Sequence, residues 1–596
     1  MHKPRFLITI ALLVIYNFFF WSEKLGANLF IFFTLGIIAM LFMNEENIKN
    51  KNVIVSMLAA LYSSAMVVFV NSGYSKFAAF VCFMIFTGYI HQPQLQTVYN
   101  AVLTTFSSFV IFPYNVYIEL KYFASKFRAF KMVLKFAKLA FIPVIFFVIF
   151  YAIYAYSNPV FNSYSVTFWD SIGKYLYDIF INYPILRFFY ILLGLMLITA
   201  FIYNNKIRVF TELDNSFHET LQRDKIFKVH SRTRPVPKSH LMYTMFSYRF
   251  KPNSLKLETK MGIVLLVMMN ALLVLLNIID VQVTWLGFDA SNIDNLAYYV
   301  HEGTYYLIFS ILLSMAILLV IFRGSQNYLA SNKALKLLAY TWIVQNAFMA
   351  VSVSLRNIYY IEHYFALSFK RIGVMIFIIL TLAGLVTMLL KIHQKRTTFW
   401  LFKINSMAAI VMLLIMSSFS WDNVIAEFNL KNPVKEKIDI EYLLKLNNDA
   451  LPVLDKHRDV LDREFMEYSF IFGDYKNGLD VYKERVADFE MEQENYSWLS
   501  WNLPDDRTLQ YYKEHGKDIY LIKNRNIDSL KNKIKEKNGH IEIVPRRENE
   551  NEINAREVRE NEPKIEDTPK TKDTPKTEET PKLNAPPEKD TKPKER

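Results

Sequence analysis

The chain has little of what several kinds of functional site require. It holds one cysteine in 596 residues, Cys82, which lies inside an apolar run. A single thiol excludes a disulfide within the chain, a zinc site built from several cysteines, and an iron–sulfur cluster. We therefore interpret Cys82 as a small buried side chain.

Sequence motifs for nucleotide binding and hydrolysis are also missing. There is no P-loop, no dinucleotide-binding glycine pattern, no H-E-x-x-H zinc helix, no G-x-S-x-G turn and no protein-kinase motif set. His218, His230 and His240 lie in one basic segment, but their spacing fits no metal site. The sequence thus gives no reason to expect a cofactor or a metal.

Apolar residues, in contrast, are abundant, at 53% hydrophobic and 16% aromatic. They gather into blocks, many of them near the roughly 20 residues that a helix needs to cross about 30 Å of hydrocarbon. The blocks lie at about 6–21, 26–43, 53–70, 77–90, 98–118, 134–156, 184–203, 261–279, 304–322, 337–355, 372–390 and 399–420. We predict an all-α, polytopic transmembrane helical bundle of about 11–12 spans.

Composition predicts how this chain is divided. Residues after Trp421 are charged, rich in tyrosine and helical in pattern, and the last segment repeats Thr-Pro-Lys with almost no apolar side chains. The expected parts are an N-terminal membrane half (1–203, about 6–7 spans, with an interfacial helix near 163–181), a basic cytoplasmic loop (204–260), a C-terminal membrane half (261–420, five spans), a helical extramembrane domain (421–540) and a disordered tail (541–596).

Charge predicts the orientation. The net charge of +13 is concentrated in short loops between the apolar blocks, which is the positive-inside pattern and not a nucleic-acid-binding face. Segments 119–138, 323–336 and 391–396 are basic and should be cytoplasmic, whereas 280–303 carries only acidic charges and should lie outside. This alternation puts the C-terminal domain on the outer side of the membrane.

The first five blocks do not fit this alternation. Five full crossings before the basic 119–138 segment would put the N-terminus outside, against Lys3 and Arg5. We therefore expect one block not to cross: either 77–90, which is only 14 residues long, or the block that contains Pro113.

Polar side chains within the blocks are mainly amides. Ion-coupled transporters usually keep ionisable residues inside their spans, and here the mid-span polar residues are instead Asn17, Asn270, Gln345 and Asn346. We interpret these amides as hydrogen-bond partners between helices, which argues against an ion-coupled transporter.

A candidate site lies at the outer ends of the later blocks. It comprises His301, Glu302, Arg356, Glu362, His363 and Arg371. A histidine beside a carboxylate can transfer protons, and arginine can hold an anionic headgroup or pair with a carboxylate such as Glu302. The competing interpretation is that these charges anchor the helix ends at the membrane interface.

A resemblance appears at these residues. FALSFKR (365–371), preceded by Arg356, resembles the Tyr-Gly-Leu-Thr-x-x-Arg signature of an uncharacterised bacterial multi-pass membrane family, a domain of unknown function. YYVHEGTYYLI (298–308), VIAEFNL (424–430) and DIEYLLKLNNDALPVL (439–454) are similar to further elements of that family. Phe365, Ala366 and Ser368 depart from its signature, whereas Arg371, Arg356, Glu302 and Gly303 match. The resemblance implies the architecture and the candidate residues, but no activity.

These observations predict a non-catalytic envelope scaffold or sensor-like protein. Its partners would be the lipid bilayer and an envelope protein that binds 421–540, with no nucleic acid. The alternative is a membrane enzyme or carrier that acts on a lipid-linked or anionic substrate at the outer-face site.

Overall fold

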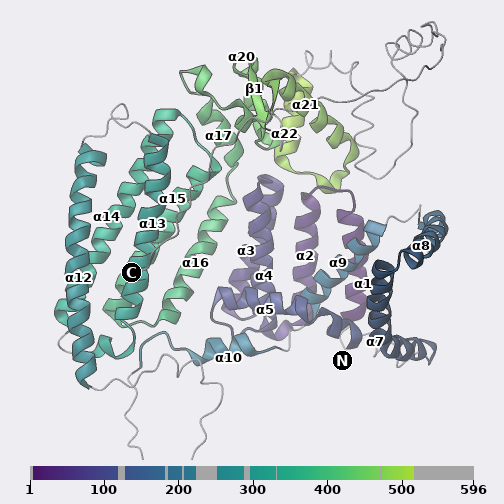
Figure 1. Ribbon diagram of the computed structural model, residues 1–596, viewed down its shortest axis with the longest axis horizontal. Coiled ribbons are helices and arrows are strands. Elements are labelled where there is room, and N and C mark those ends of the chain that lie inside the picture. Colours follow the sequence, from purple (N-terminus) through teal and green to yellow (C-terminus); the bar gives the residue numbers. More distant parts are fainter. Residues whose placement is uncertain are drawn as a thin grey trace, which may run out of the picture. The chain divides into compact units, whose positions relative to one another are not determined.

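The computed structural model describes residues 5–118, 128–180, 185–203, 207–222, 252–286, 296–329, 332–468 and 473–515, in some stretches only as backbone (Figure 1). Within these ranges the chain is almost entirely helical and contains one two-stranded sheet. The all-α prediction is confirmed. The predicted tail, 541–596, lies outside the described residues.

Apolar helices form the bulk of the described chain. They are α1 (Arg5–Phe20), α2 (Ala27–Met43), α3 (Lys51–Phe69), α4 (Gly73–His91), α5 (Val98–Val110), α7 (Arg128–Ser157), α8 (Pro159–Phe180), α9 (Ile185–Ile202), α12 (Pro252–Asp280), α13 (Leu296–Ile321), α14 (Lys333–Tyr364), α15 (Phe369–Gln394) and α16 (Thr398–Met416). Six of the described helices are long and apolar enough to cross a membrane, and five shorter ones are apolar. Apolar helices of this length can cross a membrane, because a helix satisfies its own backbone hydrogen bonds in lipid. Their number indicates a multi-pass membrane protein.

Among the described helices, the block with Pro113 is broken. Helix α5 and the following helix, Phe112–Ile118, meet at 57°, which makes them a broken span or a re-entrant pair. The other block that we expected not to cross, 77–90, belongs to α4, a helix of 19 residues that is long enough to span. The expectation of one non-crossing block therefore falls on α5 and its continuation.

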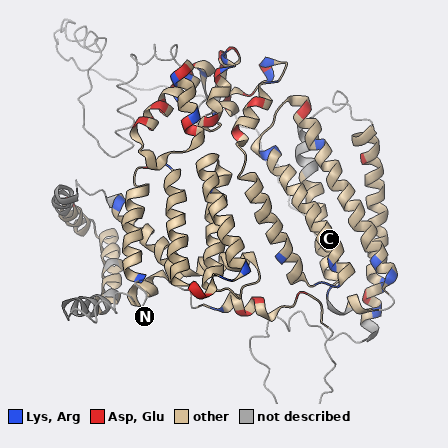
Figure 2. Ribbon diagram, turned by 180° about the vertical axis from the view of Figure 1, so that it is seen from behind, with Lys and Arg blue, Asp and Glu red and all other residues tan. Residues whose placement is uncertain are grey.

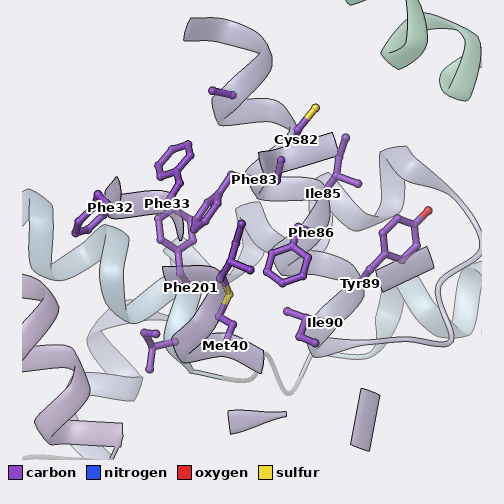
Figure 3. Close-up of a cluster of buried hydrophobic side chains, with 14 of the residues drawn as sticks. Phe32, Phe33, Met40, Cys82, Phe83, Ile85, Phe86, Tyr89, Ile90 and Phe201 are labelled. Atoms are coloured by element: carbon purple, nitrogen blue, oxygen red, sulfur yellow. The ribbon is translucent and has the colours of Figure 1, made fainter. Parts of the chain in front are cut away.

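The N-terminal membrane half packs around aromatic side chains from α2, α4 and α9 (Figure 3). The Phe33 and Phe83 rings stack with centroids 4.2 Å apart, and Phe201 meets Phe83 edge-on at 4.8 Å. Helices α4 and α5 approach so closely that a Cβ on Gly88 would lie 2.2 Å from the Ala101 carbonyl oxygen. Such close packing is what holds helices together in lipid, where apolar burial alone gives little.

The C-terminal membrane half has its own core from α12 to α16, and amides link two of its helices. Gln345 Nε2 on α14 donates to Asn270 Oδ1 on α12 at 2.9 Å, and Asn270 Nδ2 donates to the Leu338 carbonyl at 3.1 Å. In the other half, Arg187 Nε donates to Asn17 Oδ1 at 3.2 Å. These amides bond between helices as predicted, whereas Asn346 bonds within its own helix.

Residues 421–515, hereafter the platform domain, follow α16. Its elements are α17 (Trp421–Asn429), η6 (Lys435–Lys437), α18 (Ile440–Leu444), η7 (Asn448–Ala450), α19 (Leu451–Asp455), α20 (Arg458–Leu461), β1 (Glu464–Tyr468), β2 (Gly473–Asn477), α21 (Gly478–Asn495), η8 (Trp498–Ser500) and α22 (Leu503–His515). The antiparallel β1–β2 hairpin adds a small sheet that the helical prediction missed. Its apolar core continues into the membrane helices through Ile372 and Met416.

Hydrogen bonds show which connections share an end of the bundle. Asn47 Nδ2 donates to the Ile90 carbonyl at 2.8 Å, so the α2–α3 and α4–α5 connections lie together. Residues 207–222, hereafter the strap, include α10 (Val209–Ser216) and join this end to the α15–α16 connection, where Thr397 Oγ1 donates to the His218 carbonyl at 2.6 Å. We call this end the basal face. Figure 2 shows that lysine, arginine and acidic residues gather mainly at the two ends of the helices.

The strap is anchored by a buried carboxylate. Asp214 is fully buried and accepts hydrogen bonds from the Gln96 and Thr97 backbone N–H groups at 2.8 and 3.0 Å. The Thr97 hydroxyl and the Asn100 amide donate to it as well. Asp214 thus occupies the N-terminus of α5, where the helix dipole favours a negative charge.

Candidate functional site

The first candidate residue, Arg356, is part of a buried ion pair. Helix α14 continues to Tyr364, so Arg356 lies two turns inside the helix and not in the connection that we predicted. Its guanidinium donates to the Asp280 carboxylate at the end of α12, and the side chains are 8% and 1% exposed. We had assigned Asp280 to an outer loop, since the sequence gives no sign that α12 includes it. The pair ties α12 to α14.

Arg371 is also buried, in the first turn of α15. Its guanidinium carbon lies 3.7 Å from the centroid of the Tyr360 ring, a cation–π contact. Asn357 bonds to Arg371 twice: its amide donates to the Arg371 carbonyl at 3.2 Å and accepts from Nη1 at 3.3 Å. Asn357 and Tyr360 were not among the predicted site residues, although they lie one and four positions after Arg356.

The turn between α14 and α15 is bound to the platform domain. Asn429 on α17 clamps Leu367, accepting from its N–H at 2.7 Å and donating to its carbonyl at 3.0 Å. The Tyr442 hydroxyl on α18 accepts from the Phe369 N–H at 3.0 Å. Three of the four segments that carry the family resemblance, 365–371, 424–430 and 439–454, therefore come together.

Backbone geometry accounts for two residues of this turn. Phe365 ends α14 with φ of 46°, a left-handed conformation that favours glycine or asparagine over an aromatic residue. Ser368 caps α15, its side chain accepting from the Arg371 N–H at 3.4 Å. A hydroxyl at position 368 is thus explained by the helix start, as a threonine would be.

Of the remaining candidates, Glu362 and His363 have described side chains, and these make no described contact with Arg356 or Arg371. Glu362 and His363 are exposed on the last turn of α14, and the His363 ring contacts its neighbour Tyr364. The backbone of His301 and Glu302 belongs to the first turns of α13, but their side chains lie outside the described residues. Among the four candidates with described side chains, the structure therefore brings together Arg356 and Arg371 and leaves Glu362 and His363 apart.

The platform domain also binds the N-terminal half, at the turn between α1 and α2. Lys24 N–H donates to Ser500 Oγ at 2.8 Å, and Ala27 N–H donates to the Trp501 carbonyl at 2.9 Å. A Cβ on Gly26 would lie 2.5 Å from the Ser500 carbonyl oxygen, so only glycine allows this approach. Lys24 pairs with Glu492 of α21 at 2.5 Å. The platform domain therefore holds both membrane halves.

The described contacts of Arg356 and Arg371 give these residues a structural role. No group of three or more histidine, cysteine or acidic side chains that could hold a metal occurs in the part of the chain that the structure describes. Arg356 and Arg371 are engaged by Asp280, Asn357 and Tyr360, so both guanidiniums hold helices together.

Comparison with known proteins gives one result. The model of the family DUF4153, described as a domain of unknown function, matches residues 7–457. This range covers both membrane halves, the α14–α15 turn and the start of the platform domain. No curated protein and no solved structure matches the chain.

Proposed function

The chain belongs to the DUF4153 family, and we propose that it is a non-catalytic, sensor-like scaffold of a bacterial inner membrane, with its platform domain outside. The observation that carries the proposal is the use made of the signature residues. Arg356 and Arg371 fix α12, α14 and α15 to one another, and the turn beside them is bound by Asn429 and Tyr442. The residues that match the family signature therefore position the platform domain. This arrangement supports a function in which the membrane bundle presents the platform domain to a partner.

Lysine and arginine support the orientation. The basal face includes the connection with Lys391, Lys395 and Arg396, and cytoplasmic loops carry an excess of such residues. If α5 and its continuation return to the basal face and α8 lies along the interface, eleven of the described helices cross, and the N-terminus and segment 119–138 are both cytoplasmic. The platform domain, at the other end, then lies outside.

The alternative function, an enzyme or carrier acting at the outer end, would rest on Glu362 and His363. They are the candidate acid and base that the described contacts leave exposed. Neither group is sheltered from water, and a sheltered site is where acid–base groups gain most of their catalytic effect. The exposed position agrees better with an interfacial charge.

A complementation assay separates the two functions. A deletion strain with a measurable envelope phenotype is complemented with the double variant Glu362→Ala, His363→Ala. The scaffold function predicts full complementation, because these side chains support no described contact between elements. Loss of complementation by a normally expressed, folded double variant would favour the enzyme or carrier.

Photo-crosslinking in cells tests whether the platform domain meets a partner. A photoreactive phenylalanine replaces Tyr475, which is 69% exposed on β2 of the platform domain. The matched control replaces Tyr306, which is 72% exposed on the apolar helix α13. The scaffold function predicts protein adducts at position 475 and lipid adducts at 306. Absence of protein adducts at 475 and at other exposed platform positions would contradict it.

A further inference from the structure

Two carboxylates are buried where the platform domain meets helix α4. Asp422 opens α17 and Asp449 lies in η7, and the residues are 7% and 8% exposed. Asp422 accepts a hydrogen bond from the Asn447 N–H at 2.9 Å. Asp449 accepts one from the Ser420 hydroxyl through one oxygen, and its other oxygen has no hydrogen-bond partner among the described residues. Burying a charged oxygen without a donor is costly.

The charges around these groups do not balance at neutral pH. Asp505 of α22 adds a third carboxylate within electrostatic range, and Lys76 of α4 and Arg485 of α21 are the cations that face the group. Lys24, also near Lys76, is engaged by Glu492. Three carboxylates against two cations leave one negative charge in excess, and a proton on one carboxylate would remove it.

Asp449 is the group best placed to take that proton. Burial, and then the charges of Asp422 and Asp505, raise the pKa of its carboxyl to about 6, although the Ser420 hydrogen bond opposes the change. Burial also raises the pKa of Asp422, but two backbone hydrogen bonds and the charges of Arg485 and Lys76 oppose the change there. A carboxyl that is neutral in mildly acidic medium needs no donor for its free oxygen.

We propose that Asp449 is a proton-binding switch at the junction between the platform domain and the N-terminal membrane half. When Asp449 is protonated, the platform domain is held more tightly to that membrane half. The junction is suited to such coupling. Lys76 belongs to α4 of the membrane half, and the Tyr74 and Phe369 rings meet across the same region with centroids 6.2 Å apart. The ligand is the hydrogen ion of the medium that bathes the platform domain. That this medium is extracytoplasmic rests on the proposed function.

The test is hydrogen–deuterium exchange of the full-length protein in nanodiscs, corrected for the intrinsic pH dependence of exchange. Peptides from 71–77, 421–430, 447–455 and 499–512 report the opening of the junction. With a pKa of about 6 in the closed state, the opening constant should be about fourfold smaller at pH 5.5 than at pH 7.5. No change in protection between these pH values would overturn the proposal.

Two variants and a control identify the group. Asp449→Asn should give at both pH values at least the protection that the unmodified protein shows at pH 5.5, and an unchanged pH dependence would overturn the proposal. Ser420→Ala removes the hydrogen bond that lowers the pKa, so the midpoint should move to higher pH, which a purely structural role would not cause. Asp480→Asn, at a side chain that is 78% exposed, should behave like the unmodified protein. The measurement needs no partner protein, so its failure would leave the scaffold function standing.

Discussion

Asp280 and Arg356 form an ion pair between two membrane helices, with both side chains more than nine-tenths buried. Removing one partner of a buried pair strongly lowers the stability, because the other partner is left as a buried, unpaired charge. Arg356→Ala and Asp280→Ala should each lower the stability by about 3–5 kcal/mol. The double variant should be clearly less destabilised than the sum of the two, as measured by unfolding in nanodiscs.

An exposed ion pair supplies the control for this double-mutant cycle, in which the two single variants are compared with the double variant. Lys445 and Glu441 on the platform domain have side chains 62% and 29% exposed. Their coupling should be about 0.3–0.5 kcal/mol, as for pairs one helical turn apart in water. Equal coupling in the two cycles would mean that burial of Asp280 and Arg356 adds nothing.

Loss of Asn429 should loosen the platform domain from the α14–α15 turn. Asn429→Ala removes both hydrogen bonds to the Leu367 backbone, and we expect a loss of about 1–3 kcal/mol, since a part-buried N–H and carbonyl lose these partners. Limited proteolysis in nanodiscs should release the domain faster. Asn495→Ala, where an exposed side chain bonds only within α21, should leave the rate unchanged.

The stability of the protein should depend on Asp449 with a definite sign. Its carboxyl has a pKa of about 6 in the folded protein against an ordinary value of 3.8 for aspartate, so the folded state binds the proton more tightly. The stabilisation is full below pH 3.8 and is lost as the pH rises through 6. Asp449→Asn should therefore be more stable than the unmodified protein at pH 7.5, by about 1–2 kcal/mol. The difference should shrink toward pH 5, as followed by thermal unfolding.

Asp214 should be essential for the attachment of the strap. Asp214→Ala leaves the Gln96 and Thr97 N–H groups without their carboxylate, which should cost at least about 2 kcal/mol. Thermal unfolding measures the loss, and exchange at residues 207–222 should rise. Glu212→Ala, on the same short helix and exposed, should change neither. An equal effect of the two variants would contradict the anchoring role of Asp214.

Cysteine labelling tests the orientation and the broken helix together. In a Cys82→Ala background, Lys437→Cys on the platform domain should react with a membrane-impermeant reagent in intact cells, and Lys49→Cys and Gln394→Cys should not. Tyr117→Cys should behave like Lys49→Cys, because a helix pair bent by 57° can return to the face from which it came. Labelling of position 117 from outside would show that this block crosses the membrane.

Hydropathy was enough to predict the membrane helices, because a lipid-spanning helix must be apolar along some 20 residues. It did not predict where α14 ends, because Arg356 and Asp280 are charged yet lie inside helices as a pair. The sequence of α12 or α14 alone does not indicate that its charged residue pairs with one in the other helix. Sequence similarity indicated Arg356 and Arg371 and could not show that Asn357 and Tyr360 bind the latter. The β1–β2 hairpin was missed because its residues, such as Glu464 and Lys476, show no clear apolar alternation.

The contact between Lys24 and Ser500 has a consequence for biogenesis. These residues are 476 positions apart, and the first of them leaves the ribosome long before the second. The α1–α2 turn therefore lacks its contacts with Ser500 and Trp501 while all the later membrane helices are being synthesised. Closure of that end of the bundle is therefore a late step of folding, which begins only after residues 500 and 501 have been synthesised. A chain truncated before residue 500 would lack these contacts, and the α1–α2 turn would stay uncovered at that end of the bundle.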